Sequence, residues 1–293
     1  MEFSVQQQFL PAVVIVTMVT IGMELHIRQF RELLAAPRVP VLGTLVHTLA
    51  FPLLAVGLVL GLRASGLPVA ESTVVGILLI AACPSGGFSN VLTMMARANL
   101  ALSVTLTVIS SALSFLSVPL LMGAFAGLIV GLDEPIALPV LPTLVQLLVL
   151  ILLPISAGMG IRARWGHWTE LNVGRIQNAA QIALYICIAL IVVENWGVMV
   201  DGARDALPWS LLLCAANLAV CFGASRALGL GVEDGITVAM EGAIRNLAVA
   251  LLVAVSILER PDIAALPTVY FVAVLIVAVL FARNWRRLLG APG

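Results

Sequence analysis

The decisive stretch of this sequence is CPSGGFSN, residues 83–90, which interrupts a long apolar segment close to its middle. Pro84 removes a backbone donor and clashes with the preceding helical turn, while Gly86 and Gly87 add conformational freedom. Freed backbone groups need partners in hydrocarbon, so a break at this depth has to be buried in protein or line a wet cavity. A broken membrane helix of this type indicates the binding site of a transporter.

The composition around this break is that of a polytopic membrane protein. Of the 293 residues, 61% are hydrophobic and 10% are charged, whereas soluble domains carry about 25% charged residues. The mean hydropathy is +1.13. The net charge is zero, which argues against a nucleic-acid partner. We therefore expect a chain embedded in the lipid bilayer, with no cofactor and no obligatory protein partner.

Nine apolar segments are long enough to span a bilayer, which takes about 20 residues of helix. They cover residues 9–25, 39–62, 72–96, 101–125, 138–161, 176–195, 207–228, 234–257 and 266–284. No soluble domain or long linker separates these segments. The sequence therefore predicts an all-α polytopic membrane protein with one transmembrane domain over residues 1–293.

The arginines test this count independently, because cytoplasmic loops of membrane proteins carry an excess of basic residues. With alternating sides and the N-terminus outside, eleven arginines fall inside and three fall outside. The inside set is Arg28, Arg31, Arg38, Arg97, Arg162, Arg164, Arg175, Arg226, Arg283, Arg286 and Arg287. The outside set is Arg63, Arg204 and Arg260. This bias predicts a protein of the inner (plasma) membrane with its C-terminus in the cytoplasm.

Three ionisable side chains lie at membrane depth, where a charge costs about 2.5–3.5 kcal/mol or more. Glu241 and Arg245 are four residues apart, so they share one helix face if the segment 234–257 is continuous. In the simpler interpretation, Glu241 and Arg245 only neutralise each other. In the more specific one, Glu241 supplies its carboxylate to a bound cation. The third group, His47, is by itself more typical of a hydrogen-bonded core histidine than of a proton carrier.

The two halves of the chain show a weak internal similarity. Asn90 follows the break, and Asn246 lies in the charged stretch 156 residues later. This interval is about half the chain and contains an odd number of helices, as inverted repeats require. We therefore expect an inverted-repeat transporter fold.

The motif at the break resembles the signature of the bile acid:sodium symporter family. The residues that carry the resemblance are CPSGGFSN at 83–90, MARANLALSV at 95–104 with Thr107, and MEGAIRN at 240–246. The resemblance implies a sodium-coupled importer of organic anions that works by alternating access, with two crossed, discontinuous helices near the membrane centre. It also places the start of this chain at about the family's second helix, which agrees with nine helices rather than ten.

The resemblance places one sodium site on side chains that all carry oxygen. These are Ser89, Asn90, Ser103, Thr107 and Glu241. The family's second sodium site uses two glutamines, and at those positions this sequence has His47 and Arg245. Both substitutions bring nitrogen donors to a place that needs oxygen acceptors, and a guanidinium can neither coordinate sodium nor lose its charge.

These substitutions lead to the hypothesis that Arg245 is a built-in cation replacing the second sodium, paired with Glu241 and close to His47. Transport then couples to one sodium ion. Two alternatives remain open on the same fold. One is proton coupling through His47, since the ordinary histidine pKa of about 6.5 allows switching. The other is an uncoupled organic anion transporter or exporter. An enzyme is disfavoured, because the sequence offers no convincing reactive constellation.

Two further departures bear on the substrate. Gly87 stands where the family has threonine, and Phe88 stands where it has alanine. With Asn246, these residues are candidates for substrate binding or coupling. Because the lost hydroxyl and the added ring should reshape a cavity, bile acids are not carried over as the substrate. A small or medium carboxylate is the expected organic anion.

Overall fold

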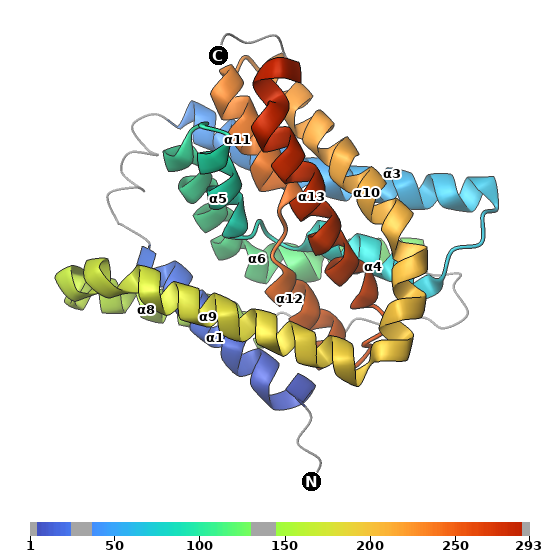
Figure 1. The fold of residues 1–293 in the computed structure, drawn as a ribbon, viewed down its shortest axis with the longest axis horizontal. Helices are drawn as coiled ribbons and strands as arrows, with labels where there is room; N and C mark the ends of the chain where they lie inside the picture. Colours follow the sequence, from blue (N-terminus) through green and yellow to red (C-terminus); the bar gives the residue numbers. More distant parts are fainter. Residues whose placement is uncertain (1–4, 25–36, 130–144, 289–293) are drawn as a thin grey trace.

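The computed structural model describes residues 5–24, 37–129 and 145–288. These residues fold into helices and short turns, and no β-strand occurs within the described ranges. Two groups of helices are visible in Figure 1. One group lies low in that view and contains α1, α8 and α9, and the other contains the remaining helices.

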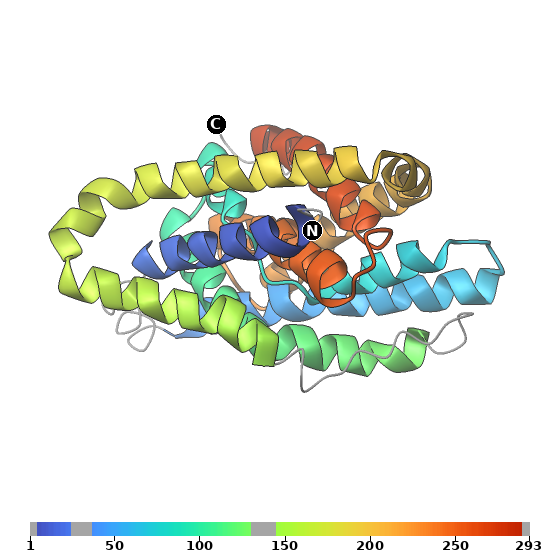
Figure 2. The ribbon, with the colours of Figure 1, turned by 90° about the horizontal axis from the view of Figure 1, so that it is seen from below.

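The first group is a panel of three helices. Its members are α1 (Val5–Glu24), α8 (Leu153–Arg164), which continues the π-helical turn η1 (Leu148–Leu152), and α9 (Gly166–Glu194). Helix α1 runs between α8 and α9 (Figure 2). Gly22 and Gly158 lie where α1 and α8 meet, and a methyl group at either would overlap the backbone of the other helix. Small residues of this kind let membrane helices approach closely.

The second group is built around two discontinuous helices that are buried along most of their length. The first consists of α4 (Glu71–Ala82) and α5 (Phe88–Met95). The second consists of α11 (Val232–Ala243), α12 (Leu247–Leu251) and the π-helical turn η2 (Leu252–Ile257). Residues 73–86 and 236–255 are all buried. A helix that is apolar on all sides needs neighbours on all sides, and these two segments form the interior.

Four long helices surround this interior. They are α3 (Arg38–Ser65), α6 (Leu100–Ile129), α10 (Trp196–Ala227) and α13 (Ala265–Leu288). Helix α6 bends by 64° between its parts Leu100–Ser114 and Leu116–Phe125. Pro119 explains the bend, because a proline cannot donate to the carbonyl four residues earlier and its ring crowds that carbonyl.

Every predicted apolar segment overlaps helix in the described residues, although residues 25 and 138–144 lie outside them. Two predicted starts are wrong. Helix α9 begins at Gly166 rather than 176, and α10 begins at Trp196 rather than 207, so residues 196–206 are helical and not a loop. Hydropathy marks where a helix becomes apolar, whereas backbone hydrogen bonding decides where it starts.

The structure supports fewer complete spans than the sequence predicts. Within the described ranges, five helices are long and apolar enough to cross a membrane alone, and a sixth qualifies if the two parts of α6 count as one span. The discontinuous helices do not qualify, because each half is too short to span hydrocarbon by itself. The chain is thus a multi-pass, all-helical membrane protein.

Candidate functional site

The two helix breaks meet each other and pair through their backbones. The amide of Gly86 donates to the carbonyl of Ile244 (3.0 Å), and the amide of Asn246 donates to the carbonyl of Pro84 (2.9 Å). These bonds form an isolated antiparallel bridge between Ser85 and Arg245. Four of the backbone groups that the breaks release from their helices are therefore satisfied by each other, as burial in a membrane protein requires.

Gly86 is required by this pairing, and its neighbour Gly87 is not. A Cβ atom at Gly86 would lie 3.0 Å from the carbonyl oxygen of Arg245, whereas one at Gly87 has nothing within 4 Å. We expect Gly86→Ala to lower the free energy of unfolding by about 1–3 kcal/mol, the cost of overpacking a close contact. Gly87→Ala should leave it nearly unchanged. Thermal unfolding of both purified variants in detergent checks this, and equal stability of the two would contradict the close approach.

Beside the crossing, three hydroxyl groups surround one buried carboxylate. Glu241, on α11, is fully buried. Ser89, on α5, donates to its Oε1 at 2.6 Å, and Ser103, on α6, donates to the same atom at 2.5 Å. Thr107, one turn further along α6, donates to both oxygens at 3.1 and 2.9 Å. The structure therefore brings together four of the five side chains expected at the sodium site.

Asn90 is the fifth expected ligand, and it does not join this cluster. Its Oδ1 is buried without a hydrogen-bond partner among the described residues, and its side chain lines a cavity on the side of α9. Two residues absent from the prediction extend the polar cluster instead. Ser85 lies in the break, and its hydroxyl is 2.8 Å from that of Ser110 on α6. Ser85 could have been found from its place in the break, and Ser110 from its helical spacing of three and seven residues from Thr107 and Ser103.

The predicted pairing of Arg245 with Glu241 is wrong. The helix that was to place both on one face stops at Ala243, and Arg245 lies in the break. The described part of the chain contains no ion pair between them. The guanidinium of Arg245 donates instead to the carbonyls of Cys83 (3.1 Å) and His47 (2.8 Å). It also stacks over the ring of Phe51, at 4.7 Å from the centroid, in a cation–π contact.

The His47 side chain differs from the expected hydrogen-bonded histidine. The residue is fully buried, and within the described residues neither ring nitrogen has a hydrogen-bond partner. The backbone carbonyl, rather than the ring, makes the contact with Arg245. A buried polar atom without a partner costs about 1–3 kcal/mol, so the ring is the least satisfied group near the crossing.

Two residues hold the carbonyls that end α11. Asn217, on α10, donates its side-chain amide to the carbonyl of Gly242 at 2.5 Å. Tyr270, on α13, donates its hydroxyl to the carbonyl of Ala243 at 2.7 Å. Neither residue is a predicted site residue, because an asparagine or a tyrosine in an apolar segment carries no signal for what it contacts. Both carbonyls are thereby occupied by protein donors.

Two adjoining cavities separate the crossing from the panel. A small one, of about 50 Å³, is lined by residues of both breaks, including Gly86, Gly87 and Asn246. A larger one, of about 880 Å³, lies between α5 and α9. The two share Gly87, Phe88, Gln177, Gln181 and Tyr185. Asn246 also caps α12, since its Oδ1 accepts from the amide of Val249 at 3.3 Å. All three candidate substrate residues thus lie at these cavities.

Comparison with known proteins identifies relatives that are named as sodium-dependent transporters or sodium cotransporters. YocS of Bacillus subtilis, an uncharacterized sodium-dependent transporter, is 32% identical over 216 residues, which are 73% of this chain and 61% of that protein. A probable chloroplastic sodium/metabolite cotransporter of Arabidopsis thaliana is 25% identical over 272 residues, which are 93% of this chain and 65% of that protein. Human sodium/bile acid cotransporter 4 is 27% identical over 165 residues, which are 56% of this chain and 36% of that protein.

The chain spans less than two thirds of the length of these relatives. The named relatives are transporters, which agrees with the expectation that this protein is not an enzyme. A family model described as the Sodium Bile acid symporter family matches residues 11–202, more than half of the chain. The protein therefore belongs to the sodium bile acid symporter family.

Proposed function

We propose that this protein is a sodium-coupled symporter that moves an organic anion across the membrane by alternating access. The carrying observation is the buried carboxylate of Glu241, with hydroxyls from α5 and α6 around it, directly beside two paired helix breaks. An ionisable group at membrane depth is expensive and marks ion or substrate pathways. Discontinuous helices supply backbone groups for ion and substrate sites at the same depth.

The Glu241 cluster has the chemistry that a sodium ion requires. Its five oxygens come from Ser89, Ser103, Thr107 and the carboxylate of Glu241. Oxygen ligands suit hard cations, and the hydroxyls can turn their lone pairs toward an ion. No arginine is within ion-pair distance of Glu241 in the described residues, so a bound cation would neutralise the carboxylate. Asn90 is not part of this donor set.

The small cavity has the chemistry that an anion requires. Residues at and just before the starts of two half-helices, α5 and α12, line it together: Gly86, Gly87, Phe88, Asn246, Leu247 and Ala248. The N-terminus of a helix carries partial positive charge, which favours a carboxylate. Because α12 continues directly into η2, its dipole is longer than its own five residues. A small or medium carboxylate fits this site, with Gly87 and Phe88 shaping its entrance.

Arg245 supports coupling to one sodium ion rather than two. Its guanidinium already donates to two backbone carbonyls, those of Cys83 and His47, beside the crossing. The carbonyl of Gly242 is likewise taken by Asn217. A second cation would have to share these carbonyls with their donors and approach a buried positive charge. One sodium ion with one monovalent anion makes the transport cycle electroneutral.

The proposal includes nine spans with an outside N-terminus and inverted halves. Hydrogen bonds between helix ends support the two sides. Trp285 donates to the carbonyl of Ala96 at 2.9 Å, and both lie at ends assigned to the cytoplasm. Thr73 donates to Asp205 at 2.7 Å, and both lie at ends assigned to the outside. The pairing of two similarly placed breaks supports inverted repeats.

Uptake of a panel of labelled organic acids into proteoliposomes tests the function. We expect at least one small or medium carboxylate to accumulate when a sodium gradient points inward, and not when potassium replaces sodium. Without a gradient the substrate should equilibrate but not accumulate. Equal flux with and without sodium would instead identify the uncoupled transporter or exporter.

A second candidate is proton coupling, which the unpartnered ring of His47 favours. A histidine with two unsatisfied ring nitrogens has an acceptor available for a transported proton. Under this alternative, a pH gradient drives uptake in the absence of sodium, and His47→Gln removes that dependence. Under the sodium mechanism, a pH gradient alone drives no accumulation. The same proteoliposomes serve for both measurements.

A further inference from the structure

The large cavity continues from the crossing along one face of α9 toward the turn between α8 and α9. The α9 residues that line it include Glu170, Gln177 and Gln181. Glu170 and Gln181 are about 16 Å apart along the helix, because an α-helix rises about 1.5 Å per residue. The volume of about 880 Å³ is typical of a ligand pocket. It is much larger than a single carboxylate at the crossing needs.

The two walls of this cavity differ in chemistry. The wall formed by α5 and α6 is mainly apolar and contains Phe88, Val91, Met94, Leu100 and Val104. The wall formed by α9 carries a carboxylate at Glu170 and, two helical turns further on, the amides of Gln177, Asn178 and Gln181. A long ligand with an apolar body therefore fits between the walls. Its first polar end would lie at the crossing, and its second would lie near the α8–α9 turn.

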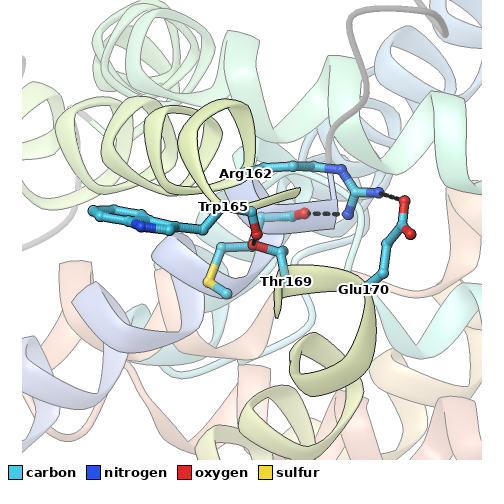
Figure 3. A network of polar contacts seen from close by, with 5 residues as sticks. Arg162, Trp165, Thr169 and Glu170 are labelled. Carbon is cyan, nitrogen blue, oxygen red and sulfur yellow. Dashed lines mark hydrogen bonds and ion pairs between the residues drawn. The ribbon is translucent and has the colours of Figure 1, made fainter. Parts of the chain in front are cut away.

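Arg162, at the end of α8, provides the positive charge at that second end. Among the described residues that line the cavity, it is the only cationic one. Its Nη1 donates to the carbonyl of Met23 on α1 at 2.8 Å, and its Nη2 lies 3.3 Å from Oε1 of Glu170. Figure 3 shows the guanidinium directed toward the carboxylate of Glu170, with the ring of Trp165 directed away from it.

The contact with Glu170 is of a kind that a ligand can replace. The Arg162 side chain is 10% exposed, whereas that of Glu170 is 62% exposed. An ion pair with one largely solvated partner contributes little to stability. The hydrogen bond to the carbonyl of Met23 meanwhile holds the guanidinium of Arg162 at a fixed place against α1. Glu24 also lines the cavity; its carboxylate is hydrogen-bonded to Gln177 and interacts electrostatically with Arg162. Glu170 is the largely solvated acid on Arg162, so it is the one that an incoming oxyanion would displace.

We infer that Arg162 is a second substrate anchor, so the preferred substrate is an elongated organic anion with an oxyanion at each end. One carboxylate lies in the small cavity at the crossing, and the other replaces Glu170 on Arg162. This inference rests on the proposed function, because it assigns a substrate class to the same cavity. Glu170 occupies Arg162 when no substrate is bound, which keeps the buried guanidinium paired.

The test compares α,ω-dicarboxylates of increasing chain length with their monomethyl esters, as stabilisers of the purified protein against heat in sodium. We expect one chain length of dicarboxylate to bind about tenfold more tightly than its ester, the scale of one charge-assisted hydrogen bond. Arg162→Gln should remove this difference and leave binding of the ester unchanged. Glu170→Gln should strengthen dicarboxylate binding. Arg164→Gln, an exposed position two residues further on, is the control and should bind like wild type.

Two outcomes separate this inference from the proposed function. If dicarboxylates and esters stabilise every variant equally in sodium, the transporter proposal stands and the second anchor is overturned. If Glu170→Gln weakens dicarboxylate binding, the exchange at Arg162 is overturned in the same way. If no carboxylate stabilises the wild-type protein in sodium, the proposed function fails and the anchor fails with it.

Discussion

Glu241→Gln is expected to abolish sodium-driven accumulation of the substrate. Glutamine keeps acceptor capacity for Ser89, Ser103 and Thr107 but removes the negative charge that a cation needs. Interactions with a charged group contribute about 1.5–3 kcal/mol, so sodium affinity should fall about tenfold to a hundredfold. The measurements are sodium-dependent uptake in proteoliposomes and sodium-dependent thermal stabilisation in detergent.

The control for this variant is Glu233→Gln on the same helix. Glu233 is exposed in the first turn of α11, eight residues before Glu241, and its replacement should leave sodium dependence unchanged. The melting temperature without sodium shows whether the variants are folded. Glu241→Gln should melt at or above the wild-type temperature there, because it no longer buries an uncompensated charge. Normal sodium-driven uptake by Glu241→Gln would contradict the assignment of the cation site.

The break between α4 and α5 could be predicted from its own residues. The break between α11 and α12 could not. Pro84 and two adjacent glycines leave no way to continue α4 as a helix. The run around Ile244 has no proline, and local propensity favours a continuous helix there. That helix stops because its partner break offers the carbonyl of Pro84 and the amide of Gly86. Only the family resemblance implied two broken helices.

The same difference explains which site residues were placed correctly. Ser103 and Thr107 are four residues apart on a continuous helix, so their common direction toward Glu241 follows from the helical period. Arg245 was assigned to Glu241 by the same rule, which fails because the rule holds only in a helix. Asn90 follows Ser89 directly, and adjacent helical residues face different directions. Its position toward the cavity of α9 is consistent with that geometry.

Contacts between segments that are distant in the sequence could not be predicted from sequence patterns. The cation–π contact of Arg245 with Phe51 and the capping of Gly242 by Asn217 join positions on separate helices. Each depends on how α3, α10 and the crossing pack in three dimensions. The sequence indicated that Arg245 needs acceptors, because a buried guanidinium must be satisfied. It did not indicate that backbone carbonyls, rather than the nearest carboxylate, supply them.

Arg245→Gln is expected to convert the protein from one sodium ion per cycle to two. Removing the guanidinium frees the carbonyls of Cys83 and His47 and removes the positive charge that excludes a second cation. The Hill coefficient for sodium should rise from about one toward two, its upper limit being the number of sites. Charge movement per monovalent substrate should rise from zero to one positive charge.

The stability of this variant should become dependent on sodium. Without sodium, Arg245→Gln loses two charged hydrogen bonds to carbonyls and the contact with Phe51. Each such hydrogen bond contributes about 1.5–3 kcal/mol, so the melting temperature should fall. Added sodium should restore it, because an ion that binds only the folded state stabilises that state.

The matched variants are Arg38→Gln and the double variant His47→Gln with Arg245→Gln. Arg38 lies at the start of α3 and contacts the carbonyl of Leu228, so its replacement should leave sodium cooperativity unchanged. In the double variant, two amide oxygens replace two nitrogen donors near the crossing, which should raise sodium cooperativity further. Two sodium ions per monovalent anion in the wild-type protein, or unchanged cooperativity in both Arg245 variants, would show that Arg245 does not stand in for a cation.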